Sequence, residues 1–345
     1  ESEIAREIAA ELKITLTPAE IKKIEKVPTK NLEAYNYYLL GRHFWNKRTL
    51  ENYNKSIYYY EKAIQKDSTY GLAYAGMADT YHLISIQGSS ENRNKLRDKT
   101  VELTQKALEF DENLAMVHTV LGSIYTYNDH EWEKAEKEFL KAIELDPNYP
   151  TAHQYYAELL RILCRHQEAR KHINTALELD PLSFVIKYQS AKSYFNQGNF
   201  EEALKGSQQC HDLIKDHPWL AGLDFNIYYF AGMELEALEK FKKYNLQIKS
   251  FNSSEEIDSV YKASGFDGLF RSWIEHAPGD IYLHAQIYSC IGEYDKALDL
   301  LEQLCEEKKI STSVGYIIDF KPLHSHPRFI AILEKMNLTG KYPGY

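Results

Sequence analysis

Four alanines recur at a constant interval of 34 residues, and this period constrains the fold more than any other feature of the sequence. They are Ala135, Ala169, Ala203 and Ala237, in the similar phrases EKAEKEF, QEARKHI, EEALKGS and LEALEKF. A glycine stands five residues before the last two, and an aromatic residue or leucine stands nine or ten residues before each. A fixed period of about 20 to 50 residues indicates an array of repeated units rather than a set of conventional globular domains.

The residues between the alanines predict two antiparallel helices in each unit, joined by a short turn. Alanine is small enough for helices to approach closely, and the abundant aromatic residues, among them 27 Tyr and 14 Phe, fill the space between units. Pro147 and Pro181 mark unit junctions, because proline cannot continue a helix. This pattern resembles the tetratricopeptide repeat family. The resemblance implies an all-α fold, an α-α superhelix (TPR solenoid) of about seven helix pairs.

The repeat pattern extends in both directions and divides the chain into five segments. We expect N-terminal connector or capping helices at 1–30, an array of six repeat units at 31–244, an inserted helical hairpin at 245–277, a last unit at 278–309 and a C-terminal capping segment at 310–345. In the hairpin, Ser253 or Ser254 is predicted to cap one helix, Gly265 to end it, and Leu269 to His276 to form the second. The turns KRTLENYNK and QGSSENRNK are predicted to be three and ten residues longer than the standard turn.

Three stretches resemble a narrower group, bacterial signalling and transcriptional proteins in which a tetratricopeptide array follows an effector domain. These stretches are residues 4–45, 129–160 and 323–338. In that group the upstream domain is a nucleotide cyclase, a protein kinase, a winged-helix DNA-binding domain or a TolB-like domain. No such domain is present in this sequence, and His326 stands where the group has an acidic residue. Because position 1 is Glu, we expect the sequence to be part of a longer protein.

Charge and composition exclude several classes of protein. The net charge is −9, from 50 acidic and 41 basic residues, without the basic stripe of a non-specific nucleic-acid-binding protein. No apolar run reaches the roughly 18–20 residues of a membrane helix, so we expect no membrane insertion. Four separated cysteines without a CxxC motif favour a reducing compartment, although their even number leaves an oxidised pair open. We expect a cytoplasmic location, or one outside the cytoplasm if a membrane helix lies upstream.

The sequence contains no recognisable catalytic or cofactor motif. GxxxxGK[ST], GxGxxG, HExxH and GxSxG are all absent. Two groups of histidines lack Cys or acidic partners at metal-ligand spacing. They are His324 with His326, and His153 with His166 and His172. Cys210 precedes His211, but neighbouring residues on a helix point in different directions. We therefore predict a protein that is not an enzyme and that holds no metal and no cofactor.

The resemblance implies that the first helices of the units line a concave face where a partner binds. Aromatic residues offer a large contact area at a small entropy cost, and their polar edges can bond a peptide backbone. The predicted binding residues are Tyr35, Tyr38, Arg42, Trp45, Asp79, His82, Thr126, Tyr127, Gln154, Arg161, Tyr188, Lys192, Phe195, Trp219, Asn226, Tyr229 and Tyr282. The alternative is that most of these tyrosines are core residues that pack between helices. The carboxylate clamp best known in the family is absent, since its second-unit position holds Gly76 and its third-unit positions hold Met116 and Val120.

Taken together, these patterns predict a non-catalytic scaffold or adaptor that binds a protein or peptide. One hypothesis for the partner is the missing upstream domain of the same protein. The alternative function is a regulatory or ligand-sensing arm of a larger bacterial signalling or transcriptional protein. We expect no direct nucleic-acid contact by this region. Homodimerisation through an exposed terminal helix face is a further hypothesis.

Overall fold

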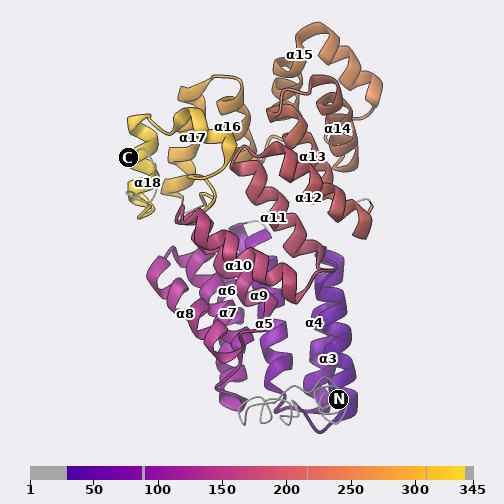
Figure 1. The fold of residues 1–345 in the computed structure, drawn as a ribbon, viewed down its shortest axis with the longest axis vertical. Coiled ribbons are helices and arrows are strands. Elements are labelled where there is room, and N and C mark those ends of the chain that lie inside the picture. The colour runs from indigo at the N-terminus through magenta and orange to yellow at the C-terminus, as the bar shows by residue number, and fades with distance from the viewer. Residues whose placement is uncertain (1–28, 88–89, 216, 308, 339–345) are drawn as a thin grey trace. The chain divides into compact units, whose positions relative to one another are not determined.

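The computed structural model describes residues 29–87, 90–215, 217–307 and 309–338, and its regular secondary structure is helical (Figure 1). Among these residues there is no β-strand, so the predicted all-α repeat fold is confirmed. The N-terminal helices predicted at 1–30 fall almost entirely on residues 1–28, which lie outside the described residues. The chain divides into two compact units, residues 1–121 and residues 122–345, and each is described by itself.

The first unit contains two helical hairpins. Its helices are α3 (Leu32–Trp45), α4 (Leu50–Lys66), α5 (Gly71–Gln87) and α6 (Ser90–Phe110), and α7 (Ala115–Ile124) runs across the boundary between the units. Helix α3 pairs with α4, α5 pairs with α6, and α4 also packs against α5. Tyr60 of α4 is fully buried beside Gly41 of α3 and Gly76 of α5. A Cβ atom at either glycine would lie within 2.6 Å of the Tyr60 ring, so both positions require the absence of a side chain.

The prediction of two long turns in this unit is wrong. Helix α6 begins at Ser90 and is 21 residues long, so residues 90–95 of QGSSENRNK belong to the helix. Helix α4 begins at Leu50, with the Thr49 hydroxyl accepting a hydrogen bond from the Asn52 amide as its cap, so most of KRTLENYNK is helical too. The physical reason is that Glu, Arg and Lys are good helix formers, and a polar stretch without Pro reads equally well as an exposed first turn.

The second unit continues the hairpins and ends in a different kind of segment. Its helices are η1 (Tyr125–Asp129), α8 (Trp132–Leu145), α9 (Pro150–Ile162), α10 (His166–Leu179), α11 (Phe184–Asn196), α12 (Phe200–Leu213), α13 (Pro218–Phe230), α14 (Glu234–Gln247), α15 (Ser254–His276), α16 (Ile281–Cys290), α17 (Tyr294–Glu306), η2 (Ile318–Leu323) and α18 (Pro327–Lys335). The hairpins pair α9 with α10, α11 with α12, α13 with α14, and α16 with α17.

The turn inside each hairpin of the second unit contains one residue with positive φ. These residues are His130, Cys164, Gly198, Gly232 and Gly292, with φ between 55° and 78°. Each lies five residues before a repeat alanine, so the period of the sequence is also a period of backbone conformation. In the first of the four repeats, Ala135 comes ten residues after the aromatic residue Tyr125, where the other repeats have a spacing of nine. The π-helical turn η1 begins at Tyr125. A π-helical turn accommodates one extra residue within a helix.

Two features of the second unit lie outside the regular repeat. Helix α15 is capped by the Ser253 hydroxyl, which accepts from the Glu256 amide at 3.2 Å, and is broken at Gly265 with φ 62°. The other feature is the segment of residues 309–338, which packs against helices at the start of the second unit. The Trp132 indole donates to the Met336 carbonyl at 3.0 Å, and Phe320 belongs to the same core cluster. Among the described residues, no helix is long and apolar enough to cross a membrane.

Candidate binding site

The segment between α17 and α18 lies across the first helices of the hairpins in the second unit. At α9, the Arg161 guanidinium lies 5.8 Å from the centre of the Tyr316 ring. At α16, the Ser289 hydroxyl donates to the Asp319 carbonyl at 2.7 Å, and the Tyr282 and Ser313 hydroxyls are 3.3 Å apart. The face on which we expect ligand binding is therefore partly occupied by this chain's own residues.

A cavity of about 420 Å³ lies between helices α11, α13, α14 and α16 and this segment. It is lined by aromatic, amide and hydroxyl groups together with one amine and one carboxylate. The lining residues that belong to the predicted binding set are Tyr188, Lys192, Phe195, Trp219, Asn226 and Tyr282. A second cavity of about 150 Å³ shares Asn226 with it and is also lined by Tyr229. The structure thus brings together, in one place, predicted residues that come from three different repeat units.

Aromatic rings form one wall of the larger cavity. The rings of Tyr188 and Trp219 lie 5.4 Å apart, and both are half-buried, so they pack on each other while keeping an exposed edge. Tyr229 makes edge contacts at 5.2 Å with Phe266 and Phe270 of α15. Tyr188 and Tyr229 are therefore neither purely core nor purely surface residues, because each packs against other rings and is only half-buried.

Two opposite charges line the larger cavity. Burial lowers the pKa of the Lys192 amine, and the positive charge of Arg161 lowers it further. Burial raises the pKa of the Asp319 carboxyl, while hydrogen bonds to its own backbone and to the Gln286 amide oppose that rise. Within the described residues, Lys192 makes neither a hydrogen bond nor an ion pair at contact distance. A ligand that supplies an acceptor to Lys192 would therefore gain an interaction that the protein itself does not use.

The predicted residues of α7 to α9 are committed to an internal network. The Tyr127 hydroxyl donates to the Glu158 carboxylate, which also accepts from the Gln154 amide at 3.0 Å. Arg161 donates to the Gln189 carbonyl and side chain at 3.3 and 3.1 Å. The Thr126 hydroxyl donates to the carbonyl four residues earlier and is buried. The bonds of Tyr127 and Arg161 connect neighbouring repeat units, and the segment carrying Tyr316 covers Arg161.

The predicted residues of the first unit gather on α3 and α5. They are Tyr35, Tyr38, Arg42, Trp45, Asp79 and His82. Trp45, Asp79 and His82 are buried. The Arg42 guanidinium stacks 4.1 Å above the Trp45 ring and lies 3.8 Å from an Asp79 carboxylate oxygen. Burial raises the pKa of Asp79 to about 6 against the opposing charges of Arg42 and Arg48, and burial lowers the pKa of His82 to about 3. At neutral pH Asp79 is therefore ionised and paired with Arg42, and the His82 imidazole is neutral.

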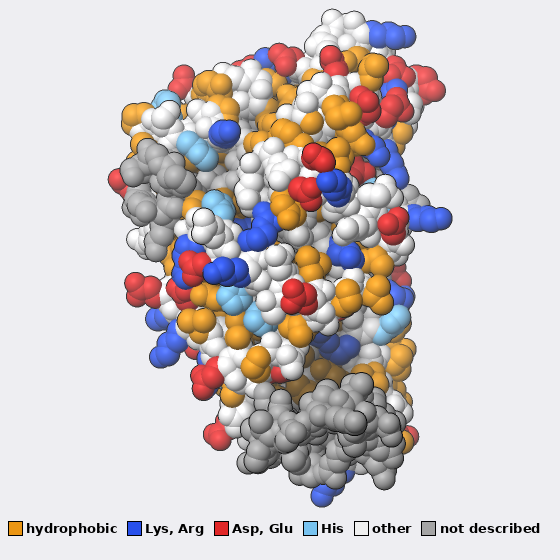
Figure 2. Space-filling view, in the orientation of Figure 1, with side chains coloured by type: hydrophobic (Ala, Val, Ile, Leu, Met, Phe, Trp, Pro, Cys, Tyr) orange, Lys and Arg blue, Asp and Glu red, His pale blue; other side chains and the backbone are white. Residues whose placement is uncertain are grey.

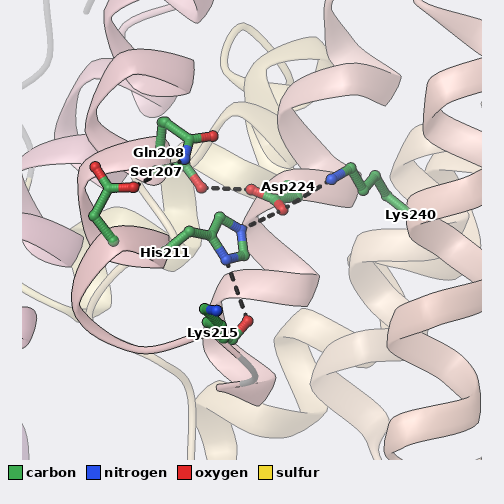
Figure 3. A network of polar contacts seen from close by, with 7 residues as sticks. Ser207, Gln208, His211, Lys215, Asp224 and Lys240 are labelled. Carbon is green, nitrogen blue, oxygen red and sulfur yellow. Dashed lines mark hydrogen bonds and ion pairs between the residues drawn. The ribbon is translucent and has the colours of Figure 1, made fainter.

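The serine, histidine and aspartate of α12 and α13 form a network, but the network lacks the geometry of a catalytic triad. Figure 3 shows the Asp224 carboxylate accepting from Ser207 on one oxygen, with His211 at 2.9 Å and Lys240 at 3.3 Å from the other. A serine nucleophile needs a base that takes its proton, and here both Ser207 and His211 bond to the same carboxylate. Burial raises the pKa of the neighbouring Cys210 thiol to about 12, so it stays protonated.

The histidine groups offer no complete metal site. In the part of the chain that the structure describes, no cluster of three or more His, Cys, Asp or Glu side chains is placed to hold a metal ion. His153 and His172 approach each other at 3.0 Å between their Nδ1 atoms, and the other ring nitrogen of His153 lies 2.9 Å from the Pro147 carbonyl.

On the face seen in Figure 2, acidic and basic side chains are interspersed rather than separated.

Several residues of the larger cavity were missed by sequence reasoning. Asn196, Tyr244 and Asp319 line it but do not belong to the predicted set. Asn196 lies at the end of α11, four residues after Lys192, so helical spacing could have found it. Tyr244 comes from a second helix, which the expected groove excludes. Asp319 lies in a segment without repeat register, and no pattern in the sequence places that segment against the hairpins.

Comparison with known proteins adds one sequence relative and several structures. No protein-family model matches the chain. The tetratricopeptide repeat-containing protein trd-1 of Caenorhabditis elegans is 30% identical over 121 residues, which are 35% of this chain and 15% of that protein. The chain thus spans far less than two thirds of that curated relative.

Three similar solved structures have TM-scores below 0.5. PilW, a widely conserved type IV pilus biogenesis factor, has a TM-score of 0.47 at 16% identity over 66% of this chain and 99% of PilW. TTC0263, a thermophilic TPR protein in Thermus thermophilus, has 0.43 at 18% identity over 59% and 99%. Yeast Tom70 has 0.48 at 16% identity over 90% and 69%. These scores are too low to add to the argument.

The 34-residue period and the helical hairpins that follow it form an all-α helical repeat of the tetratricopeptide type, and the curated relative of the 121-residue stretch is also a tetratricopeptide repeat-containing protein. The type of repeat predicted from the period is confirmed. Repeat arrays of this kind generally serve as scaffolds for protein–protein interaction, because stacked hairpins create extended binding surfaces.

Proposed function

We propose that this chain is a non-catalytic protein-binding module and that the 420 Å³ cavity of the second unit receives a short peptide segment of its partner. The observation that supports the proposal is the chemistry of the cavity lining. The Tyr188 and Trp219 rings offer apolar contact, the Asn226 amide can pair with a peptide backbone, and Lys192 offers an unused donor. The volume lies within the range of about 300–1,000 Å³ that is usual for ligand sites.

The proposed mechanism is burial of one or two partner side chains against preformed aromatic walls. Most of the lining side chains come from helices, so little of their conformational entropy is lost when they bind. The Asp319 carboxylate opposite Lys192 favours a partner segment that brings a hydrogen-bond donor to one side and an acceptor to the other. Aromatic anchors in such pockets usually carry most of the binding free energy.

The test is selection of binding peptides from a displayed random library on the full chain, followed by affinity measurements on single variants. We expect selected peptides to lose about tenfold or more in affinity for Trp219→Ala and for Lys192→Ala. The matched control is Tyr58→Ala, which removes an aromatic ring that is 52% exposed on α4 and does not belong to the lining of the cavity. Peptides that bind all three variants equally would place the site elsewhere, and a failure to select any peptide would contradict the proposal.

A further inference from the structure

A third cavity, of about 260 Å³, lies on the other side of the segment that carries Tyr316. Four structural elements meet there: the end of α9 with Arg161, the start of α10 with His166, the end of α11 with Asn196, and the segment that includes η2, with Lys321 and His324. The cavity belongs to the second unit alone. It shares Asn196 with the larger cavity but has a different chemical character.

The lining of this cavity is one-sided in charge. Arg161, His166, Lys321 and His324 all contribute to it, and among the described residues that line it none is Asp or Glu. The nearest carboxylate on α9, that of Glu158, is already satisfied by the hydroxyl of Tyr127 and the amide of Gln154. Two permanently charged cations, Arg161 and Lys321, beside two titratable imidazoles and no carboxylate favour an anionic occupant.

Several polar atoms of the lining have no hydrogen-bond partner among the described residues. They are Nε of Arg161, Nδ1 of His166 and both side-chain amide atoms of Asn196. Arg161 is only 6% exposed, and its two terminal nitrogens are already used by Gln189. A buried donor without a partner costs roughly 1–3 kcal/mol, so such groups are normally satisfied by a bound molecule or by water.

We propose that this cavity binds the oxyanion group of a small molecule, of the size and charge of a phosphate. Arg161 and Asn196 would donate hydrogen bonds from the buried wall, and Lys321, which is exposed, would approach from the open side. The cavity is larger than a phosphate ion and so leaves room for part of an organic phosphate ester. This site goes beyond the peptide-binding function proposed above and does not depend on it.

Protonation of the two histidines is coupled to the occupant. Burial and the positive charges of Arg161 and Arg170 lower the pKa of His166, while burial and Lys321 lower the pKa of His324. The other titratable groups of the lining, Cys164 and Tyr316, have raised pKa values and stay neutral. An oxyanion beside the imidazoles raises both histidine pKa values, so binding takes up protons and its affinity rises as the pH falls.

Calorimetric titration of the full chain at low ionic strength tests the proposal with three probes: inorganic phosphate, glycerol 3-phosphate and sulfate. We expect one saturable site for phosphate and for sulfate. Tighter binding of glycerol 3-phosphate than of phosphate would assign the site to an organic phosphate, and the reverse would assign it to the free ion. Sulfate serves for the pH series because its charge is constant between pH 5 and 8, and its affinity should be higher at pH 5.

Two variants and a matched control complete the experiment. Lys321→Ala and Asn196→Ala should weaken binding about fivefold or more, since each removes one donor to the anion. The control is Lys171→Ala, which removes the same charge from an exposed position on α10 that does not line the cavity. The absence of saturable binding would overturn the proposal. Equal weakening by the control would also overturn it, because that result indicates attraction to the whole surface rather than to a site.

Discussion

At the scale of single residues, each hairpin turn of the second unit has one left-handed backbone position. Glycine supplies it at Gly198, Gly232 and Gly292, whereas His130 and Cys164 adopt it with a side chain. This conformation is unfavourable by about 1–2 kcal/mol for a residue with a Cβ atom, and glycine adopts it without that penalty. A glycine therefore marks the turn in the sequence of the later repeats, whereas no glycine marks it in the two earlier repeats.

Replacing Gly232 by Ala isolates this backbone cost. A Cβ atom at Gly232 would meet no atom within 4 Å, so Gly232→Ala should lower the free energy of unfolding by about 1–2 kcal/mol through its φ of 73° alone. Gly279→Ala is the matched control, because its Cβ also meets nothing and its φ is not positive. The control should be neutral or stabilise by up to about 1 kcal/mol. Urea unfolding measures both variants, and equal effects would contradict the explanation.

Several residues of the candidate site could be predicted from the sequence, because the repeat period applies to them too. Tyr188, Lys192 and Trp219 lie at regular positions of first helices, so the period indicates which face they occupy. Arg161 lies at an equivalent position but is covered by Tyr316. The covering residue comes from a segment that has no repeat, and its position depends on packing between parts of the chain that are distant in sequence.

At the scale of helices, the Asp224 network ties three of them together. Ser207 and His211 lie one turn apart on α12, Asp224 lies on α13, and Lys240 lies on α14 (Figure 3). The carboxylate is 4% exposed, and its charge is tolerated there because it accepts from several donors at once. The network thus joins two neighbouring hairpins as well as the two helices of one hairpin.

We expect Asp224→Ala to destabilise the second unit by about 3 kcal/mol, since it leaves the buried Ser207 hydroxyl without its acceptor and separates His211 and Lys240 from their shared partner. Asp212→Ala is the control: Asp212 is exposed on α12 and, among the described residues, accepts a hydrogen bond from the Gln208 amide alone, at 3.2 Å. Its effect should stay within about 0.5 kcal/mol. Thermal unfolding of the two variants decides the matter, and similar losses would show that the network contributes no special stability.

The helices themselves were easier to predict than their ends. The period and the proline junctions indicate each hairpin, and the break of α15 at Gly265 coincides with the predicted end of a helix. The start of α6 at Ser90 was not predicted, because polar residues serve equally well in a turn and in an exposed first turn of a helix. The η1 turn is visible in the sequence only as a spacing of ten in place of nine.

At the scale of the whole second unit, the C-terminal segment changes how stability is distributed. In a linear repeat array each unit contacts only its neighbours, so stability is a sum of local terms. Here one core cluster contains Phe139 and Tyr155 from the start of the unit together with Phe320 and Phe329 from its end. The Trp132 indole also donates to the Met336 carbonyl, 204 residues further along the chain. The first and last helices of this unit therefore stabilise each other directly.

This closure predicts that a change near the C-terminus is felt at α8 and α9. Phe329→Ala removes a fully buried ring of α18, at a cost of about 3–5 kcal/mol. Amide hydrogen exchange should then accelerate in α8 and α9 as well as in α17 and α18. Helix α14 provides the internal control, because the core cluster that contains its Leu238 and Phe241 has residue 291 as its last described member. If exchange accelerates only in α17 and α18, the unit behaves as a linear array and its two ends are not coupled. If it accelerates in α8 and α9 while α14 stays protected, the coupling runs through the shared core rather than along the chain of hairpins.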